Sequence, residues 1–169
     1  MLTTAFMHEG PAAVRYPRGA GIGSETTGQS LEPLALGKGH IVRSISEKQV
    51  PLKKIAFVCF GPLLYNALPV AEELNATVVD MRFVKPLDEE LLINIARTHD
   101  ALVFVEDSAV KGGAGSACLE LLTEQNIQVQ SIQIGLPDEY VEHGEVNFLL
   151  DLYGLSSEKI KQRVLARLH

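Results

Sequence analysis

The sequence predicts an α/β protein: a three-layer α/β/α sandwich with a mostly parallel sheet of about five strands and one antiparallel edge strand. Two observations predict this fold. Nearly continuous apolar runs, such as "KIAFVCFG" at residues 54–61, are typical of strands that are buried on both faces. Between these runs, apolar residues recur at helical spacing, and strands that alternate with amphipathic helices form parallel sheets covered on both sides.

The expected strands span residues 40–45, 54–61, 76–84, 101–107 and 129–135. About nine residues connect the first strand to the second, and this connection is too short for a crossover helix. We therefore expect the first strand to be antiparallel to its neighbour and to lie at an edge of the sheet.

The expected helices alternate with the strands, and two further helices close the chain. Pro69 falls inside the first helix and should kink it or delay its start. Asp88 can cap the second helix, and Ser156 or Ser157 can cap the last. The apolar faces of the five helices include Leu64, Ala67 and Ala71; Leu91, Leu92 and Ile95; Ala114, Cys118 and Leu121; Val146 and Leu149; and Ile160 and Val164.

The composition excludes several classes of protein. With 46% hydrophobic and 21% charged residues among 169, the chain has an ordinary composition for a soluble globular domain. The net charge of −6 argues against nucleic acid as a partner, and no apolar run approaches the roughly 20 residues of a membrane span. We expect a cytoplasmic protein without a signal peptide, in which Cys59 and Cys118 are buried, reduced thiols.

The stretch "KGGAGS" at residues 111–116 lies between an expected strand and an expected helix. Backbone N–H groups at such a position can bind an anion. The glycine spacing matches neither a P-loop nor a dinucleotide-binding fingerprint. The interpretation that we favour is a tight turn between Gly112 and Ser116 that lets the following helix pack closely on the sheet.

Charged residues cluster near the predicted strand ends, where the binding sites of α/β proteins form: Asp80, Arg82, Asp88, Glu106 and Asp107. The adjacent carboxylates of Glu106 and Asp107 could do acid–base work, but neighbouring residues of a strand point to opposite faces. Helix capping, and an ion pair of Arg82 with Asp80 or Glu106, account for these residues equally well. The histidines have no metal-binding spacing, and no serine stands in a nucleophile elbow.

The stretch "GPAAVRYPRG" at residues 10–19 precedes a segment, residues 20–36, whose Gly, Ser and Thr content is typical of a linker. If the stretch is extended, Arg15 and Arg18 lie about 10 Å apart on opposite faces and do not clamp one ligand. Arg18 is presented beside Gly19, where its guanidinium can bind a phosphate or carboxylate. Arg15 is expected to form an internal ion pair.

Five segments taken together carry a resemblance: "GPAAVRYPRG", "GKGHIV", "LNATVVDMRFVKPLDEELL", "VFVEDSAVKGGAGSA" and "IGLPDEYVEHG". In this order they resemble the C-terminal portion of the 1-deoxy-D-xylulose-5-phosphate synthase family, over essentially the whole chain. The pattern "DMRFVKPLD" alone is less specific, because transketolases and the β subunits of 2-oxo-acid dehydrogenases carry similar residues.

The resemblance implies a homodimeric, thiamine-diphosphate- and Mg²⁺-dependent enzyme that joins pyruvate to D-glyceraldehyde 3-phosphate with release of CO2. Its product feeds isoprenoid, thiamine and pyridoxal-phosphate synthesis. By this resemblance, residues 1–19 end a pyrimidine-binding domain, residues 20–36 are the linker, and residues 37–169 are a transketolase-type C-terminal domain. Met1 is then expected to be an internal methionine of a longer polypeptide.

The resemblance assigns few functional residues to this chain. The family's catalytic, cofactor and metal ligands are expected in upstream domains, so none is carried over to residues 1–169. Arg18 matches a ligand of the glyceraldehyde-phosphate phosphate group, and Arg15 and Tyr16 match its structural flanks. We expect this chain alone to bind no cofactor and to be inactive. Two alternatives remain open: a stand-alone protein-binding or assembly module, and the C-terminal part of a transketolase or 2-oxo-acid dehydrogenase β subunit.

Overall fold

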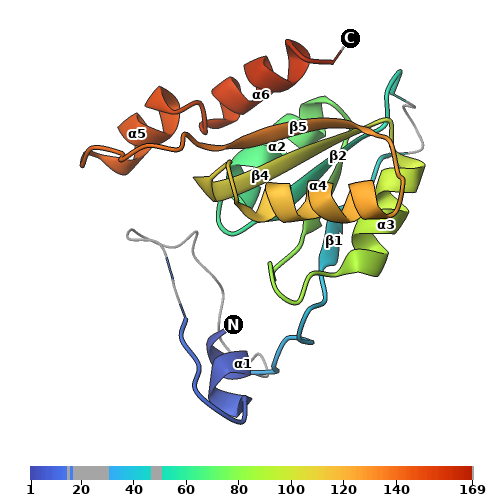
Figure 1. Ribbon diagram of the computed structural model, residues 1–169. Coiled ribbons are helices and arrows are strands. Elements are labelled where there is room, and N and C mark those ends of the chain that lie inside the picture. Colours follow the sequence, from blue (N-terminus) through green and yellow to red (C-terminus); the bar gives the residue numbers. More distant parts are fainter. Residues whose placement is uncertain (15, 17–30, 47–50, 169) are drawn as a thin grey trace.

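The computed structural model describes residues 1–14, 16, 31–46 and 51–168. Its centre is a five-stranded sheet with the strand order β1-β3-β2-β4-β5 (Figure 1). The strands β2 to β5 run parallel to one another. The edge strand β1 pairs with β3 in the antiparallel direction. The predicted fold class is therefore confirmed, including the antiparallel edge strand. The strands are β1 (His40–Arg43), β2 (Ile55–Phe60), β3 (Thr77–Asp80), β4 (Ala101–Ala109) and β5 (Gln130–Leu136).

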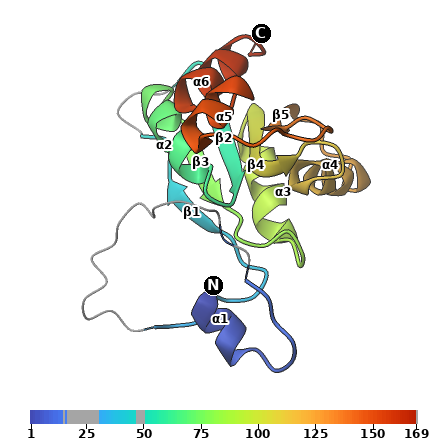
Figure 2. The same ribbon diagram turned by 90° about the vertical axis from the view of Figure 1, so that its left-hand side faces the viewer.

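Helices cover both faces of the sheet, as Figure 2 shows. Residues of α2 and α6 pack with alternate strand residues in one core cluster, and residues of α3 and α4 pack in the other. The helices are α1 (Leu2–Met7), α2 (Leu64–Glu73), α3 (Glu89–Thr98), α4 (Ala114–Glu124), α5 (Val146–Leu152) and α6 (Ser157–Leu165).

The central strands are buried on both faces because their side chains alternate between the two cores. In β2, Phe57 and Cys59 belong to the cluster beneath α2 and α6, whereas Val58 and Phe60 face α3 and α4. Both cysteines are free and buried, as predicted. Burial raises the pKa of Cys59, and it raises the pKa of Cys118 to about 12. Neither thiol is therefore ionised at neutral pH.

The third strand is shorter than predicted. The apolar run suggested a strand over residues 76–84, but β3 ends at Asp80. Arg82 has a φ of 59°, a left-handed conformation outside the β region of a regular strand. The N–H of Arg82 donates to the Asp80 carboxylate at 3.1 Å, which stabilises this local turn. The apolar residues beyond Arg82 therefore belong to the connection to α3.

Other boundaries differ less. Pro69 lies inside α2 without delaying its start at Leu64. Ser156 is the N-cap residue of α6 as predicted, but its hydroxyl donates to Asp151 and not to the helix. The sequence did not predict α1, and no residue of this helix is buried. Most of the proposed linker, and the predicted phosphate ligand Arg18, lie outside the described residues. The domain boundaries at 19 and 36 therefore stay predictions.

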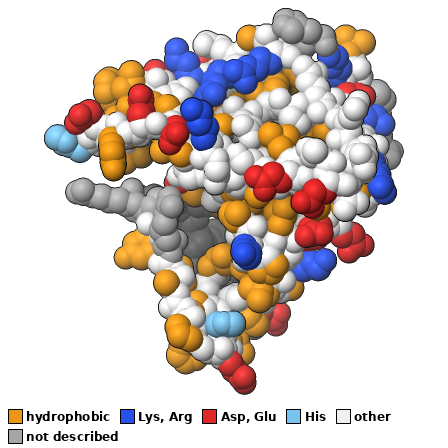
Figure 3. Space-filling model, in the orientation of Figure 1, with side chains coloured by type: hydrophobic (Ala, Val, Ile, Leu, Met, Phe, Trp, Pro, Cys, Tyr) orange, Lys and Arg blue, Asp and Glu red, His pale blue; other side chains and the backbone are white. Residues whose placement is uncertain are grey.

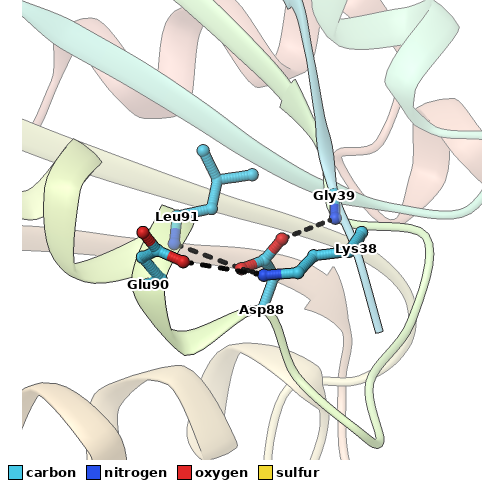
Figure 4. Close-up of polar contacts among 5 residues, drawn as sticks. All are labelled: Lys38, Gly39, Asp88, Glu90 and Leu91. Carbon is cyan, nitrogen blue, oxygen red and sulfur yellow. Dashed lines mark hydrogen bonds and ion pairs between the residues drawn. The ribbon is translucent and has the colours of Figure 1, made fainter. Parts of the chain in front are cut away.

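Asp88 joins the chain that precedes β1 to the start of α3 (Figure 4). Its side chain is 6% exposed and accepts hydrogen bonds from the N–H of Gly39 at 3.0 Å and the N–H of Leu91 at 3.3 Å. The ammonium of Lys38 lies 3.4 Å from the same carboxylate. The predicted helix cap is thus confirmed, and it also fixes the "GKG" stretch of residues 37–39.

The surroundings of Asp88 favour its ionised form. Burial opposes ionisation, but the hydrogen bonds from Gly39 and Leu91 and the charge of Lys38 outweigh it and lower the pKa of Asp88. Because the pKa is lower in the folded state, this stabilisation is fully present above the unfolded value of about 3.9. It is lost as the pH falls through the folded value.

We predict that Asp88→Ala lowers the free energy of unfolding at pH 7 by about 1–3 kcal/mol, because a cap and a charge-assisted contact are lost together. Urea denaturation of the two proteins measures the difference, which should shrink below a pH of about 3.9. Glu90→Gln is the matched control, because Glu90 is exposed and its ion pair with Lys38 is at the surface. An Asp88→Ala protein as stable as the Glu90→Gln protein would contradict the prediction.

Candidate functional site

A cleft of about 320 Å³ lies at the carboxyl ends of β2 and β4. The connection that follows β2 leads to β3 on one side, and the connection that follows β4 leads to β5 on the other. This divergence is a topological switch point, where open α/β sheets bind their ligands. The cleft is lined by Tyr16, Phe60, Gly61, Pro62, Arg82, Val84, Glu106, Asp107, Ser108 and Ala114.

Glu106 is the most buried charged residue of the cleft, with 2% of its surface exposed. Its carboxylate accepts hydrogen bonds from the N–H of Ala114 at 2.7 Å and the N–H of Gly115 at 3.0 Å. The Ser108 hydroxyl donates to the same carboxylate. Helix N-termini favour negative charge. The first turn of α4 is therefore stabilised by a carboxylate from the preceding strand, β4.

Three glycines leave room for this carboxylate. A Cβ on Gly113 would collide with the Glu106 carboxylate and with the carbonyl oxygen of Ala109. A Cβ on Gly115 would lie 3.1 Å from the Cβ of Phe104, and one on Gly135 would lie 2.8 Å from the carbonyl oxygen of Ser108. The glycines thus permit a close approach of α4 to the sheet.

These contacts decide between the two interpretations of "KGGAGS". The backbone N–H groups of Ala114 and Gly115 do bind an anion, but the anion is the protein's own Glu106 side chain. The favoured interpretation, a tight turn that lets the helix pack on the sheet, agrees with the structure. The Glu106 carboxylate thus serves to cap the N-terminus of α4.

Arg82 is the basic residue among the described residues that line the cleft. Its Nε lies 3.7 Å from the Asp80 carboxylate, which confirms one of the two predicted ion pairs; Glu106, the other candidate, is bound to α4. The Arg82 side chain is 26% exposed. Its left-handed backbone is uncommon for a residue with a Cβ, and residues in such conformations cluster at functional sites.

Tyr16 brings the N-terminal part of the chain to the same cleft. The predicted phosphate ligand Arg18 and its flank Arg15 lie outside the described residues, so phosphate binding by Arg18 stays a prediction. Among residues 1–14, 16, 31–46 and 51–168, no group of three metal-ligating side chains could hold a metal ion. No helix in these ranges is long and apolar enough to cross a membrane.

The comparison with protein families agrees with this architecture. Residues 46–160 match the family described as "Transketolase, C-terminal domain". This chain belongs to that family. The matched region thus includes the four strands β2 to β5. It also includes the Glu106 contacts and the cleft residues from Phe60 to Ala114.

Curated relatives extend the similarity to almost the whole chain. The chain is 48% identical over 166 residues to the 1-deoxy-D-xylulose-5-phosphate synthase of Methylibium petroleiphilum, which covers 98% of this chain and 26% of that protein. The synthase of Bordetella parapertussis is 46% identical over 99% of the chain. The chain spans about a quarter of the length of these relatives.

Two solved structures have a similar fold. One is described as a split-gene transketolase, an inactive beta4 tetramer; it is 31% identical, with a TM-score of 0.67 over 81% of this chain and 43% of that chain. The other is a transketolase from Leishmania mexicana, with a TM-score of 0.53 and 15% identity over 78% of this chain and 18% of that chain. The second similarity shows the fold alone.

The sequence predicted that charged residues of this transketolase C-terminal domain lie near the strand ends, but two features of the site were missed. The capping of α4 by Glu106 was not predicted, although the glycines at 113 and 115 and the acidic residue before them were visible signals. The position of Tyr16 at the cleft was also missed. No local pattern indicates it, because the contact joins distant parts of the chain.

We predict that Glu106→Gln destabilises the fold by about 2–3 kcal/mol, because an amide offers one acceptor oxygen and leaves a buried N–H of α4 unpaired. Thermal and urea denaturation measure this loss. Glu120→Gln, which neutralises an exposed residue of the same helix, is the control and should change stability by less than about 0.5 kcal/mol. Equal stabilities of the two variants would show that the Glu106 charge is not needed by α4.

Proposed function

We propose that this chain is the C-terminal part of a 1-deoxy-D-xylulose-5-phosphate synthase. The complete enzyme condenses pyruvate with D-glyceraldehyde 3-phosphate, with release of CO2, for isoprenoid, thiamine and pyridoxal-phosphate synthesis. The observation that carries this proposal is the identity of 46–48% to such synthases over 97–99% of the chain. This match includes the "VRYPRG" stretch as well as the transketolase C-terminal domain.

In this proposal, thiamine diphosphate and Mg²⁺ bind to upstream domains of a cytoplasmic, homodimeric enzyme. The described residues do not fit these groups. They contain no cluster of metal ligands, and the helix N-terminus that most resembles a diphosphate site receives the Glu106 carboxylate. In this proposal the chain contributes binding and positioning, and the catalytic groups belong to the upstream domains.

The N-terminal residues support their assignment to a neighbouring domain. Leu2, Phe6 and Met7 of α1 are 74%, 91% and 61% exposed, and α1 buries no residue. Figure 3 shows hydrophobic side chains gathered on this part of the molecule. A helix with so much exposed apolar surface requires a further protein surface for its burial. In this proposal residues 1–19 end a pyrimidine-binding domain, and the upstream part of that domain provides such a surface.

A second candidate, a self-associating module without its own catalysis, is favoured by one comparison. The split-gene transketolase is described as an inactive tetramer of a single kind of chain, and 43% of that chain is covered by this one. The exposed apolar residues of α1 are compatible with such an assembly. The two candidates differ in whether the chain acts as part of an enzyme or as an assembly unit.

For Arg18, we predict that Arg18→Ala in the complete enzyme raises the KM for glyceraldehyde 3-phosphate by roughly 10- to 150-fold. A charge-assisted contact to phosphate contributes about 1.5–3 kcal/mol. Pyruvate has no phosphate group, so its binding does not depend on this contact. Steady-state kinetics with each substrate varied in turn measure the effect. Arg97→Ala, on the exposed side of α3, is the control. Equal effects of Arg18→Ala on both substrates would indicate a structural role.

We further predict that this chain alone does not decarboxylate pyruvate when thiamine diphosphate and Mg²⁺ are added. The physical reason is that the described residues provide no diphosphate or metal site. Release of CO2 from labelled pyruvate is the measurement, with the complete enzyme as the positive control. Turnover by the chain alone would contradict the proposed division of labour.

A further inference from the structure

We propose that α5 and α6 form a self-complementary surface through which two copies of this chain pair. In this pairing, α5 of each copy lies against α6 of the other, about a two-fold axis. Such an interface is isologous, so every contact in it occurs twice. The inference concerns association; it goes beyond the reaction proposed above and does not rest on it.

The outward face of α5 is apolar. Phe148 and Leu152 are 62% and 60% exposed, and residues four apart lie on the same face of a helix. Tyr140, in the segment that leads to α5, is fully exposed. No residue of α5 is buried, although Leu150 packs against the core cluster beneath α2 and α6. This apolar face is therefore available to a further protein surface.

Charge is segregated between the two helices. No Lys or Arg stands between Lys111 and Lys159, and residues 159–169 contain no Asp or Glu. The acidic residues of the segment 137–158 are Asp138, Glu139, Glu142, Glu145, Asp151 and Glu158, and the basic residues that follow are Lys159, Lys161, Arg163 and Arg167. Figure 3 shows this division on one face of the molecule, with acidic and hydrophobic side chains over α5 and basic side chains over α6.

Most of the basic residues have no opposite charge beside them in the part of the chain that the structure describes. Among these residues, Lys161 pairs with Glu73, but no ion pair joins a carboxylate to Lys159, Arg163 or Arg167. Arg163 donates to main-chain carbonyl oxygens instead. Burial and the neighbouring charge of Arg167 lower the pKa of Arg163. A second copy that presents its acidic segment supplies the missing negative charge.

The basic residues form a ridge that a neighbouring helix can follow. Lys159, Arg163 and Arg167 are spaced by four residues, so they lie along one side of α6 and its end. The acidic segment offers matching groups, because Asp138, Glu139 and Glu142 are exposed and none of them is in an ion pair with another described residue. The two charge sets are therefore complementary between copies.

The two helices also match in length and order. α5 has seven residues and α6 has nine, so they are about 10 and 14 Å long. They follow one another along the same side of the molecule (Figure 1). A two-fold axis between them places the start of α5 opposite the end of α6 of the second copy. Glu142 then lies near Arg167 of the second copy, and Asp151 lies near Lys159 of the second copy.

The charges select this arrangement over the alternatives. If α5 met α5, the two acidic segments would repel one another, and two α6 ridges would repel in the same way. In the α5–α6 arrangement, the exposed apolar side chains of Phe148 and Leu152 lie between the ionic contacts. Burial of apolar surface then supplies most of the free energy of pairing, and the charges determine the register.

Analytical ultracentrifugation of this chain measures the pairing. We expect a monomer–dimer equilibrium whose dissociation constant rises about tenfold between about 50 and 500 mM NaCl, because salt screens exposed ionic contacts. Phe148→Ala should raise the dissociation constant by about tenfold or more, since it removes an apolar contact twice. Phe6→Ala is the matched control, because Phe6 is an exposed phenylalanine of α1. A chain that is monomeric at about 100 μM, or a dimer that Phe6→Ala dissociates and Phe148→Ala does not, would overturn the proposal.

A charge exchange tests the arrangement of the helices. Glu142→Arg and Arg167→Glu each place like charges opposite one another, so each should raise the dissociation constant by about tenfold. The double variant restores opposite charges and should pair within about threefold of the original chain. An equimolar mixture of the two single variants should pair equally well, because opposite charges then meet at both contacts. Glu120→Arg and Arg97→Glu are the controls at exposed positions of α4 and α3.

The mixture also separates pairing from misfolding, since two chains that fail to fold do not restore one another. Single variants that pair like the original chain would overturn the proposed arrangement, as would a double variant and a mixture that both stay dissociated. The tests of the proposed function involve neither α5 nor α6. A monomeric chain together with a selective effect of Arg18→Ala on glyceraldehyde 3-phosphate would overturn the pairing and support the proposed function; a dimer that obeys the charge exchange, without that selectivity, would do the reverse for the phosphate role of Arg18.

Discussion

The hydrogen bonds that Glu106 accepts from α4 are the interaction on which the rest of this structure depends. A carboxylate that is 2% exposed is costly to bury, and it is tolerated because the N–H groups of Ala114 and Gly115 and the Ser108 hydroxyl all donate to it. The contact ties the end of β4 to the start of α4. It therefore sets the shape of the cleft at the switch point, and it requires that Gly113 have no side chain.

Much of the fold could be predicted because it is encoded by local patterns. Continuous apolar runs identified the buried strands, and the short connection before β2 identified β1 as an antiparallel edge strand. The cap by Asp88 and the ion pair between Asp80 and Arg82 were also predicted, since both join residues close together in the sequence. In each case the physical cause acts within a few residues of its signal.

The remaining features depend on tertiary contacts that no local pattern carries. The run "ATVVDMRFV" is apolar enough to continue as a strand, and only the left-handed turn at Arg82, held by Asp80, ends β3 earlier. The sequence alone does not show whether the Glu106 carboxylate faces solvent or α4, because its orientation depends on where α4 packs. The contact of Tyr16 with the cleft joins parts of the chain that are far apart in sequence, so its prediction required the fold itself.

Three carboxylates at the strand and helix ends of this domain stabilise its architecture. Asp88 holds the chain before β1, Glu106 holds α4, and Asp80 holds Arg82. Each of these three carboxylates accepts from backbone N–H groups or pairs with a cation, so the polar contacts fix the connections between the strands and the helices that follow them.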